Sequence, residues 1–172
     1  MSPVLQTDRL TLRQPTGTDA PFYAAFYATA TGPGNYGGPR RADEAFRVLC
    51  TDIGHWLIKG FGKWIVTRRQ TGEALGGCGI VHPDGWPSHE LTWWLMPIAR
   101  GQGIAAEASR AVLTYAYDTL GWPVVETHMR DENTPARRLA TRLGGTVTRR
   151  ETFPDGVTRD VFALPRPAGV SA

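Results

Sequence analysis

The chain has 172 residues, of which 41% are apolar and 20% charged, and its formal net charge is +3 at pH 7. This profile is typical of a globular domain large enough to bury a core, and it excludes a fibrous or intrinsically disordered chain. The basic residues are spread along the sequence, which argues weakly for an anionic ligand and against a nucleic-acid-binding surface.

Several further classes are excluded by what the sequence lacks. Cys50 and Cys78 are isolated, so neither a disulfide framework nor a zinc knuckle is expected, and the three histidines after residue 80 lack metal-ligand spacing. The N-terminus has no basic-then-apolar signal pattern, and no apolar run approaches the roughly 18 residues of a membrane span. We therefore expect a single domain over residues 1–172, located in the cytoplasm, with no metal and no membrane contact.

The first third of the chain predicts one strand and two helices. Apolar and polar residues alternate over residues 9–14, which indicates a short strand. A helix then begins near Thr18 or Asp19, and the glycine- and proline-rich residues 29–40 end it in a loop. A second helix is expected over Ala42–Lys59, where apolar residues recur at helical spacing.

The middle of the chain changes to a strand pattern. Strands are expected at Trp64–Val66, Leu75–Val81 and Glu90–Met96, and the short turns between them imply antiparallel neighbours. An amphipathic helix over Gly103–Leu120 then provides a crossover to a strand at Val124–Met129, which can be parallel to the strand before the helix.

The last third predicts one helix and two strands. The helix Pro135–Leu143 has Asn133 or Thr134 as its cap and proline in its first turn. Strands at Thr146–Thr152 and Thr158–Leu164 follow, and the tail after them is expected to be loose. The order β-α-α-β-β-β-α-β-α-β-β predicts a mixed sheet with helices packed on it.

The stretch Arg100-Gly101-Gln102-Gly103-Ile104-Ala105 opens the long helix. Glycine allows close approach of a ligand, and the first turn of a helix has unpaired N–H groups at the positive end of its dipole. These features indicate a site for phosphate or pyrophosphate, although a plain strand-to-helix turn would need glycine as well. A dinucleotide fingerprint is disfavoured, because a proline connector precedes the glycines and too few residues follow for the remaining parallel strands.

The same stretch resembles a known family. Arg100-x-x-Gly103-x-Ala105 is similar to the Q/R-x-x-G-x-G/A signature of the GNAT N-acetyltransferases, and the opening Thr-Asp-Arg-Leu-Thr-Leu-Arg resembles their RimJ/RimL-type branch. The order of elements over about residues 5–164 looks like the whole GNAT fold. This resemblance implies an α/β GNAT fold whose mixed, mostly antiparallel central sheet has about six to seven strands flanked by about four helices.

The resemblance also implies an activity and a coenzyme site. The activity is acetyl-coenzyme A-dependent acetylation of a primary amine, on a protein N-terminus or a small molecule, by direct attack on the thioester, in a monomer or homodimer. The family pairs pantetheine with the strand before the loop, holds pyrophosphate with the loop amides, and often touches the coenzyme with an asparagine that opens the later helix. Carried onto this sequence, the coenzyme site comprises Trp94, Leu95, Met96, Arg100, Gly101, Gln102, Gly103, Ile104, Ala105, Ala106 and Asn133.

Acetylation of an amine benefits from a general base, because a lysine-like amine with a pKa of about 10.4 is protonated at pH 7. The expected base is Glu90, since His-Glu-Leu-Thr-Trp-Trp-Leu resembles a family segment whose glutamate often serves as base. The alternative is an exposed strand carboxylate without a role. Asp84 and His89 are secondary candidates.

The sequence departs from its relatives at one position. Ala136 stands where the family pattern Asn-x-x-Ser has a serine, and in several relatives a hydroxyl group near that position protonates the leaving thiolate. No general acid is therefore assigned. A non-catalytic acyl-coenzyme A-binding module remains the alternative function, followed by a nicotinamide-dependent oxidoreductase.

Overall fold

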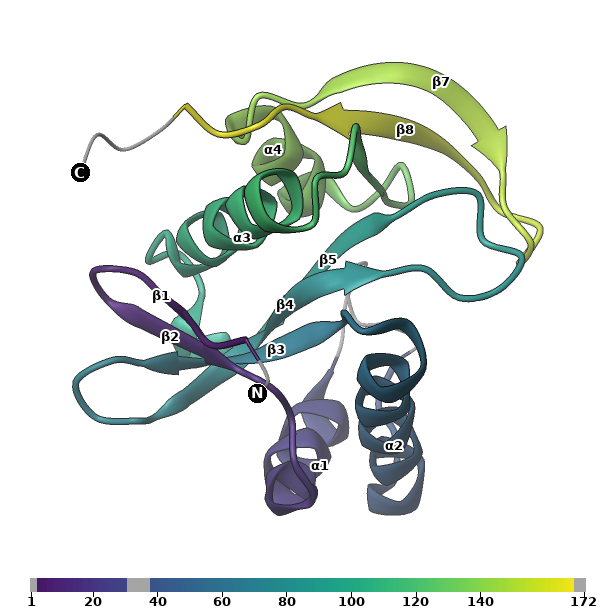
Figure 1. Cartoon of the computed structure of the whole chain (residues 1–172). Helices are drawn as coiled ribbons and strands as arrows, with labels where there is room; N and C mark the ends of the chain where they lie inside the picture. The colour runs from purple at the N-terminus through teal and green to yellow at the C-terminus, as the bar shows by residue number, and fades with distance from the viewer. Residues whose placement is uncertain (1–2, 31–37, 169–172) are drawn as a thin grey trace.

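The computed structural model describes residues 3–30 and 38–168, and Figure 1 shows these residues arranged as helices on a central sheet. The strands are β1 (Leu5–Gln6), β2 (Leu10–Arg13), β3 (Lys63–Arg68), β4 (Ala74–Val81), β5 (Glu90–Leu95), β6 (Val125–His128), β7 (Thr146–Thr152) and β8 (Thr158–Leu164). The helices are α1 (Ala20–Thr29), α2 (Ala42–Lys59), α3 (Ile104–Thr114) and α4 (Thr134–Arg142), and a π-helical turn, Tyr115–Thr119, continues α3.

The eight strands form one mixed sheet in the order β1-β2-β3-β4-β5-β6-β8-β7. Every neighbouring pair is antiparallel except β5 and β6, which run parallel. The exception follows from the sequence, because α3 lies between these two strands and carries the chain back to the end of the sheet where β5 began. The crossover therefore places β5, the loop after it and α3 in the middle of the molecule.

Helices cover both faces of the sheet, with α1 and α2 on one face and α3 and α4 on the other (Figure 1). The side chain of Trp94 on β5 belongs to the α1 face, where it is 3% exposed and packs against the rings of Phe22, Tyr23 and Phe26. Because side chains alternate along a strand, Leu91 and its odd-numbered neighbours on β5 pack on the α3 face instead.

The predicted fold class and element order are confirmed, with one correction to the strand count. The sheet has eight strands rather than about six to seven, because β1 precedes the expected first strand. A two-residue strand is too short to show periodicity and forms here by pairing with β2. The helix expected over Gly103–Leu120 is also divided, since regular α-helix ends at Thr114 and the π-helical turn follows it.

Two expectations concern segments that are only partly described. The expected loop at residues 29–40 includes residues 31–37, which lie outside the described residues. The last four residues of the C-terminal tail are likewise outside them.

Of the helices in residues 3–30 and 38–168, none has both the length and the apolar character that crossing a bilayer requires.

An ion pair between Glu126 on β6 and Arg149 on β7 ties the C-terminal strands together across β8. Arg149 donates hydrogen bonds to both carboxylate oxygens, at 2.5 and 2.9 Å, and the side chain of Glu126 is 8% exposed. The guanidinium of Arg149 holds the pKa of Glu126 below its ordinary value, although burial alone would raise it. The pair therefore stabilises the fold above the pKa of an unfolded glutamate, about 4.3, and this contribution is lost as the pH falls below that value.

We expect Arg149→Met to lower the free energy of unfolding at pH 7 by about 2 kcal/mol, since hydrogen bonds to a charged group contribute about 1.5–3 kcal/mol. The difference from the wild type should shrink as the pH is lowered below about 4. The control is Arg68→Met, which removes an exposed pair with Glu73 and should cost about 0–1 kcal/mol. Urea unfolding at both pH values measures this, and an equal loss at each would mean that Arg149 acts by packing rather than by charge.

Candidate active site

The parallel strands β5 and β6 meet only at their amino ends. Their register contains one residue pair, Glu90 opposite Glu126. The amide of Glu126 donates to the carbonyl oxygen of His89 at 3.0 Å, and the hydroxyl of Thr127 donates to the carbonyl oxygen of Leu91 at 2.8 Å. Beyond this point β5 stays paired with β4 and β6 stays paired with β8, so the two strands separate towards their carboxyl ends. We call this opening the β5–β6 split.

The peptide groups of β5 point alternately towards β4 and towards the split. The amide of Met96 donates to the carbonyl oxygen of Leu75 at 2.9 Å, which assigns the even-numbered residues of β5 to the β4 side. The peptide groups of Trp93 and Leu95 therefore face the split, and the carbonyl oxygen of Leu95 accepts a hydrogen bond from Nε of Arg100. Two residues of the expected pantetheine-binding strand, Trp94 and Met96, turn their peptide groups away from the split.

The loop between β5 and α3 is shaped by two glycines in the left-handed conformation. The φ angles are 73° at Gly101 and 76° at Gly103, and Gly103 is the N-cap residue of α3. A Cβ atom on Gly101 would meet no other atom within 4 Å, and one on Gly103 would meet only Nη2 of Arg9, at 3.6 Å. Open space therefore lies in front of the main chain at the end of the helix that attracts anions.

The other predicted loop residues hold this main chain in place. Ile104 is buried in the core between α3 and the sheet, Ala106 is also buried, and Ala105 is half-buried. The side chain of Gln102 donates to the carbonyl oxygen of Ile98 at 2.6 Å, across the turn that precedes the loop. With these side chains engaged, the first-turn amide groups of α3 are what the loop can present to an anion.

An arginine from the β1–β2 turn, Arg9, completes the loop. Its guanidinium donates to the carbonyl oxygen of Gln102 at 3.1 Å and to Glu107, in the first turn of α3, at 2.7 Å. The hydroxyl of Thr7 donates to the other oxygen of Glu107. Burial alone would raise the pKa of Glu107, but the hydrogen bonds from Thr7 and Arg9 outweigh it and hold that pKa below its ordinary value.

These contacts give the opening sequence Thr-Asp-Arg-Leu a physical role. The positive charge of Arg9 offsets a carboxylate that would otherwise repel an anion at the helix N-terminus. Arg9 is 98 positions and Thr7 100 positions from Glu107 in the chain, so no local pattern could pair them. Sequence reasoning had only the family resemblance of this opening as a signal.

Glu90 lies at the closed end of the split, at the start of β5. Its Oε2 atom accepts a hydrogen bond from the indole N–H of Trp86 at 2.9 Å and lies 3.0 Å from Nε2 of His128 on β6. The side chain of Glu90 is 15% exposed and that of His128 is 6% exposed. The predicted base is therefore a half-buried carboxylate with two polar neighbours rather than an exposed strand residue. The two secondary candidates lie elsewhere: Asp84 pairs with Lys59, and His89 stacks on Trp122.

The start of α4 lies on the α3 face of the sheet. Asn133 acts as the N-cap of the helix, since its side-chain oxygen accepts a hydrogen bond from the amide of Ala136 at 3.3 Å. Ala136 is buried with Met129 in a small cluster against which Trp93 packs. The structure thus brings the position of the missing serine next to the side chain of Trp93, whose peptide group faces the split.

Apart from Asn133 at the start of α4, the predicted site residues lie on β5 and in the loop and first turn of α3 that follow it. The loop residues lie at the open end of the split and Glu90 at the closed end, with the main chain of Leu95 between them. Sequence reasoning missed four residues that the structure adds, namely Arg9, Trp86, Trp93 and His128. Two adjacent tryptophans on a strand differ in the face they occupy, and the sequence alone does not say which face is which.

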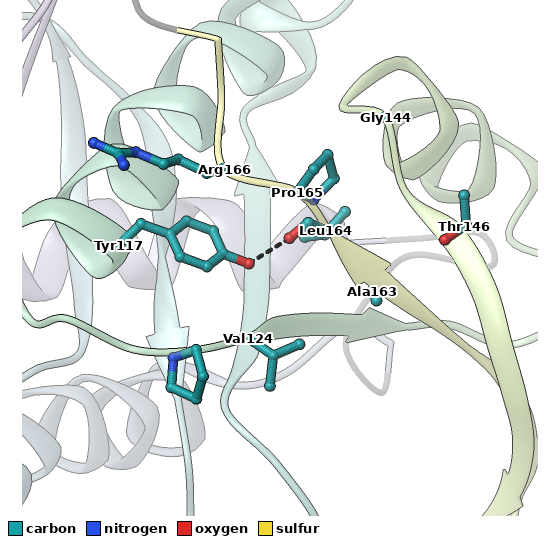
Figure 2. Close-up of a pocket in the computed structure, with 9 residues that line it drawn as sticks. Tyr117, Val124, Gly144, Thr146, Ala163, Leu164, Pro165 and Arg166 are labelled. Carbon is teal, nitrogen blue, oxygen red and sulfur yellow. Dashed lines mark hydrogen bonds between the residues drawn. The ribbon is translucent and has the colours of Figure 1, made fainter.

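A separate hollow of about 590 Å³ lies beside the ends of the π-helical turn and β8 (Figure 2). The hydroxyl of Tyr117 points to Leu164 in this view, donating to its carbonyl oxygen and accepting from the amide of Val125. None of the residues lining it is a predicted site residue.

In residues 3–30 and 38–168, no three histidine, cysteine, aspartate or glutamate side chains are grouped closely enough to hold a metal ion.

Comparison with known proteins agrees with this geometry. Residues 9–146 match the acetyltransferase (GNAT) domain. The chain is 26% identical over 175 residues to a Bacillus subtilis (strain 168) protein described as the uncharacterized N-acetyltransferase YoaA, covering 97% of this chain and 99% of that protein. A crystal structure of an acetyltransferase from Agrobacterium tumefaciens strain C58 is 33% identical with a TM-score of 0.83, covering 95% of this chain and 94% of that one.

A more distant protein, whose structure was solved with a bound ligand, has the same fold. RimL, a ribosomal L7/L12 α-N-protein acetyltransferase solved in complex with coenzyme A, has a TM-score of 0.75 at 14% identity, covering 95% of this chain and 99% of that one. Taken with the family match, the fold and the site define an N-acetyltransferase. The chain belongs to the GNAT acetyltransferase family, in its RimJ/RimL-like branch, and enzymes of this family use acetyl-coenzyme A.

Proposed function

We propose that this protein transfers the acetyl group of acetyl-coenzyme A to the nitrogen of a primary amine. An N–C bond forms as the C–S bond of the thioester breaks, and the products are the acetylated amine and the free thiol of coenzyme A. The acceptor is the α-amino group of a protein or peptide, or a small-molecule amine.

The position of Glu90 carries this proposal. It stands at the closed end of the β5–β6 split, and the same strand runs directly into the Gly101–Gly103 loop at the open end. From Glu90 to Leu95 the strand spans about 17 Å, at about 3.4 Å per residue. A donor held at the loop by its phosphates and extended along β5 would therefore place its reactive end near this carboxylate.

The residues present fit the phosphate and pantetheine parts of coenzyme A. The open space in front of Gly101 and the first-turn amides of α3 suit a pyrophosphate, and Arg9 adds a nearby positive charge. The peptide groups of Trp93 and Leu95 face the split and suit an added extended ligand. In this arrangement Asn133 keeps its capping role at the start of α4, on the same face of the sheet as α3.

Bound acetyl-coenzyme A supplies the activated acetyl group. Glu90 has the task of removing a proton from the acceptor, because an ammonium group has no lone pair with which to attack. Its partly exposed side chain can reach an amine arriving from solvent on the face of the sheet opposite α3. Since Ala136 has no hydroxyl, the departing thiolate takes its proton from water, which its pKa of about 8.5 permits.

The test is release of coenzyme A thiol from acetyl-coenzyme A in the presence of a panel of amines, with coenzyme binding measured by calorimetry in parallel. The panel contains peptides with free α-amino groups, including N-terminal serine, because structural neighbours are named as ribosomal-protein acetyltransferases. It also contains polyamines, aminoglycosides and amino acids. We expect saturable binding of coenzyme A and thiol release that depends on one class of amine.

Two other outcomes would contradict the proposal. Tight coenzyme binding with no thiol release on any amine would favour an acyl-coenzyme A-binding module. Absence of coenzyme binding by a folded protein would contradict the assignment of the loop itself.

A further inference from the structure

We propose that His128 and Trp86 are positioning residues for Glu90, which fix one of its carboxylate oxygens so that the other is presented to the acceptor amine. The inference rests on the proposed function of Glu90 as the base. It concerns two side chains from different segments, since Trp86 belongs to the β4–β5 connection and His128 to the end of β6.

Both neighbours of Glu90 approach the same oxygen. The indole nitrogen of Trp86 lies 2.9 Å from Oε2, and Nε2 of His128 lies 3.0 Å from that atom. The other oxygen, Oε1, accepts no hydrogen bond from the described residues. A carboxylate held by two donors on one oxygen keeps a fixed rotation, and its remaining basic atom points in one direction.

The contacts of His128 decide which of its nitrogens has the proton. Two lone pairs facing each other at 3.0 Å would repel, so a proton must lie between Nε2 and Oε2. The other nitrogen, Nδ1, is buried without a partner, and a proton there would be an unsatisfied donor. The arrangement that satisfies both conditions places the proton on Nε2, which donates to Glu90. The indole N–H of Trp86 lies 3.3 Å from Nε2 and 2.9 Å from Oε2, and in this arrangement it donates to Oε2.

The surroundings of His128 give it no other role. Its ring packs 3.9 Å from that of Phe153, at the start of the β7–β8 turn, and the same phenyl ring lies 5.4 Å from Trp86. An apolar side chain would fill this position without leaving a buried polar atom unpaired. A histidine that loses this much hydration, and whose ring nitrogens contact only the candidate base and the indole N–H of Trp86 among the described residues, is better explained by function than by packing.

Trp86 is itself held in place by histidines. Nε2 of His82 lies 3.0 Å from the carbonyl oxygen of Trp86, and the amide of His82 donates to Nε2 of His55 on α2 at 3.0 Å. The connection between β4 and β5 is therefore held in place where it leaves β4. This anchoring keeps the indole N–H over Glu90 in the absence of any ligand.

The first experiment compares His128→Leu, His128→Gln and Trp86→Phe with the wild type, using the best amine found. We expect His128→Leu and Trp86→Phe to lower kcat about 10- to 100-fold, the loss of one hydrogen bond to a charged group, with coenzyme affinity unchanged. Glutamine keeps an N–H near the place of Nε2, so His128→Gln should recover most of the activity. Trp122→Phe is the matched control, since Trp122 packs on His89 rather than contacting Glu90.

A double-mutant cycle separates positioning from a purely structural effect. If His128 acts through Glu90, His128→Leu should cause no further loss of kcat in a Glu90→Gln protein. An equal loss in both backgrounds, or full activity of the His128→Leu single variant, would overturn the inference.

A second measurement needs no acceptor. Long-range ¹H–¹⁵N correlation spectra of the labelled wild type report which imidazole nitrogen of His128 is protonated. We expect a proton on Nε2, and a ring protonated on Nδ1 alone would overturn the inference even if no amine were ever acetylated. Failure of the proposed function would appear separately, as a wild type without thiol release.

Discussion

Gly103→Asp should weaken coenzyme A binding by at least about 1,000-fold while the protein still folds. Gly103 is the N-cap of α3 with φ of 76°, and its main chain borders open space. A carboxylate there would stand where a phosphate must approach, and two unit charges about 4 Å apart repel by about 4 kcal/mol near a protein surface. The same carboxylate could pair with Arg9 and remove a positive charge from the site.

Backbone strain is the competing explanation for such a loss, and a matched variant separates the two. Asparagine and aspartate have nearly the same size and both tolerate the left-handed conformation, so Gly103→Asn carries the same strain without the charge. We expect Gly103→Asn to bind coenzyme A about 10-fold more weakly than the wild type, and Gly103→Asp far more weakly than Gly103→Asn. Calorimetric titration with circular dichroism as a folding check measures both. Unchanged affinity in the aspartate variant would mean that the loop is only a turn.

The second large effect is expected at Glu90. Glu90→Gln should lower kcat at pH 7 by about 10²–10⁴-fold, the usual contribution of a general base, and leave coenzyme affinity within about twofold of the wild type. The defect should diminish at high pH, because more of the acceptor amine is then already neutral. A pH–rate profile of thiol release from about pH 6 to pH 10 gives the result.

The two hydrogen bonds to Glu90 fix the orientation of the glutamine side chain in this variant, so that its effect is more specific than that of an ordinary amide replacement. Trp86 and His128 both require an acceptor at the position of Oε2, so the glutamine must place its oxygen there. Its NH₂ group then occupies the place of Oε1 and offers a donor where the acceptor amine needs a base. Glu73→Gln, in the exposed turn after β3, is the control and should retain full activity. A Glu90→Gln profile that overlays the wild type would remove Glu90 from the mechanism.

The sequence by itself determined the order of the elements and the nature of the loop. Strands and helices leave periodic patterns within a few residues, so the segments from β2 to β8 could be located to within a few positions. The paired glycines before α3, the asparagine cap of α4 and the glutamate at the start of β5 are local signals of the same kind. Together with the resemblance to GNAT enzymes, they were sufficient for the family and for the enzyme class.

Only the tertiary structure decided how these segments combine into a site. The split exists because β6 pairs with β8 while β5 stays with β4, and no local pattern specifies how far two parallel strands remain together. The same pairing decides that the peptide group of Trp93, rather than that of Trp94, faces the split. Arg9 meets Glu107 and Trp86 meets His128 across 98 and 42 positions of the chain. Such contacts depend on the packing of the whole sheet, because side chains that are far apart in sequence are brought together only when the strands carrying them are placed side by side.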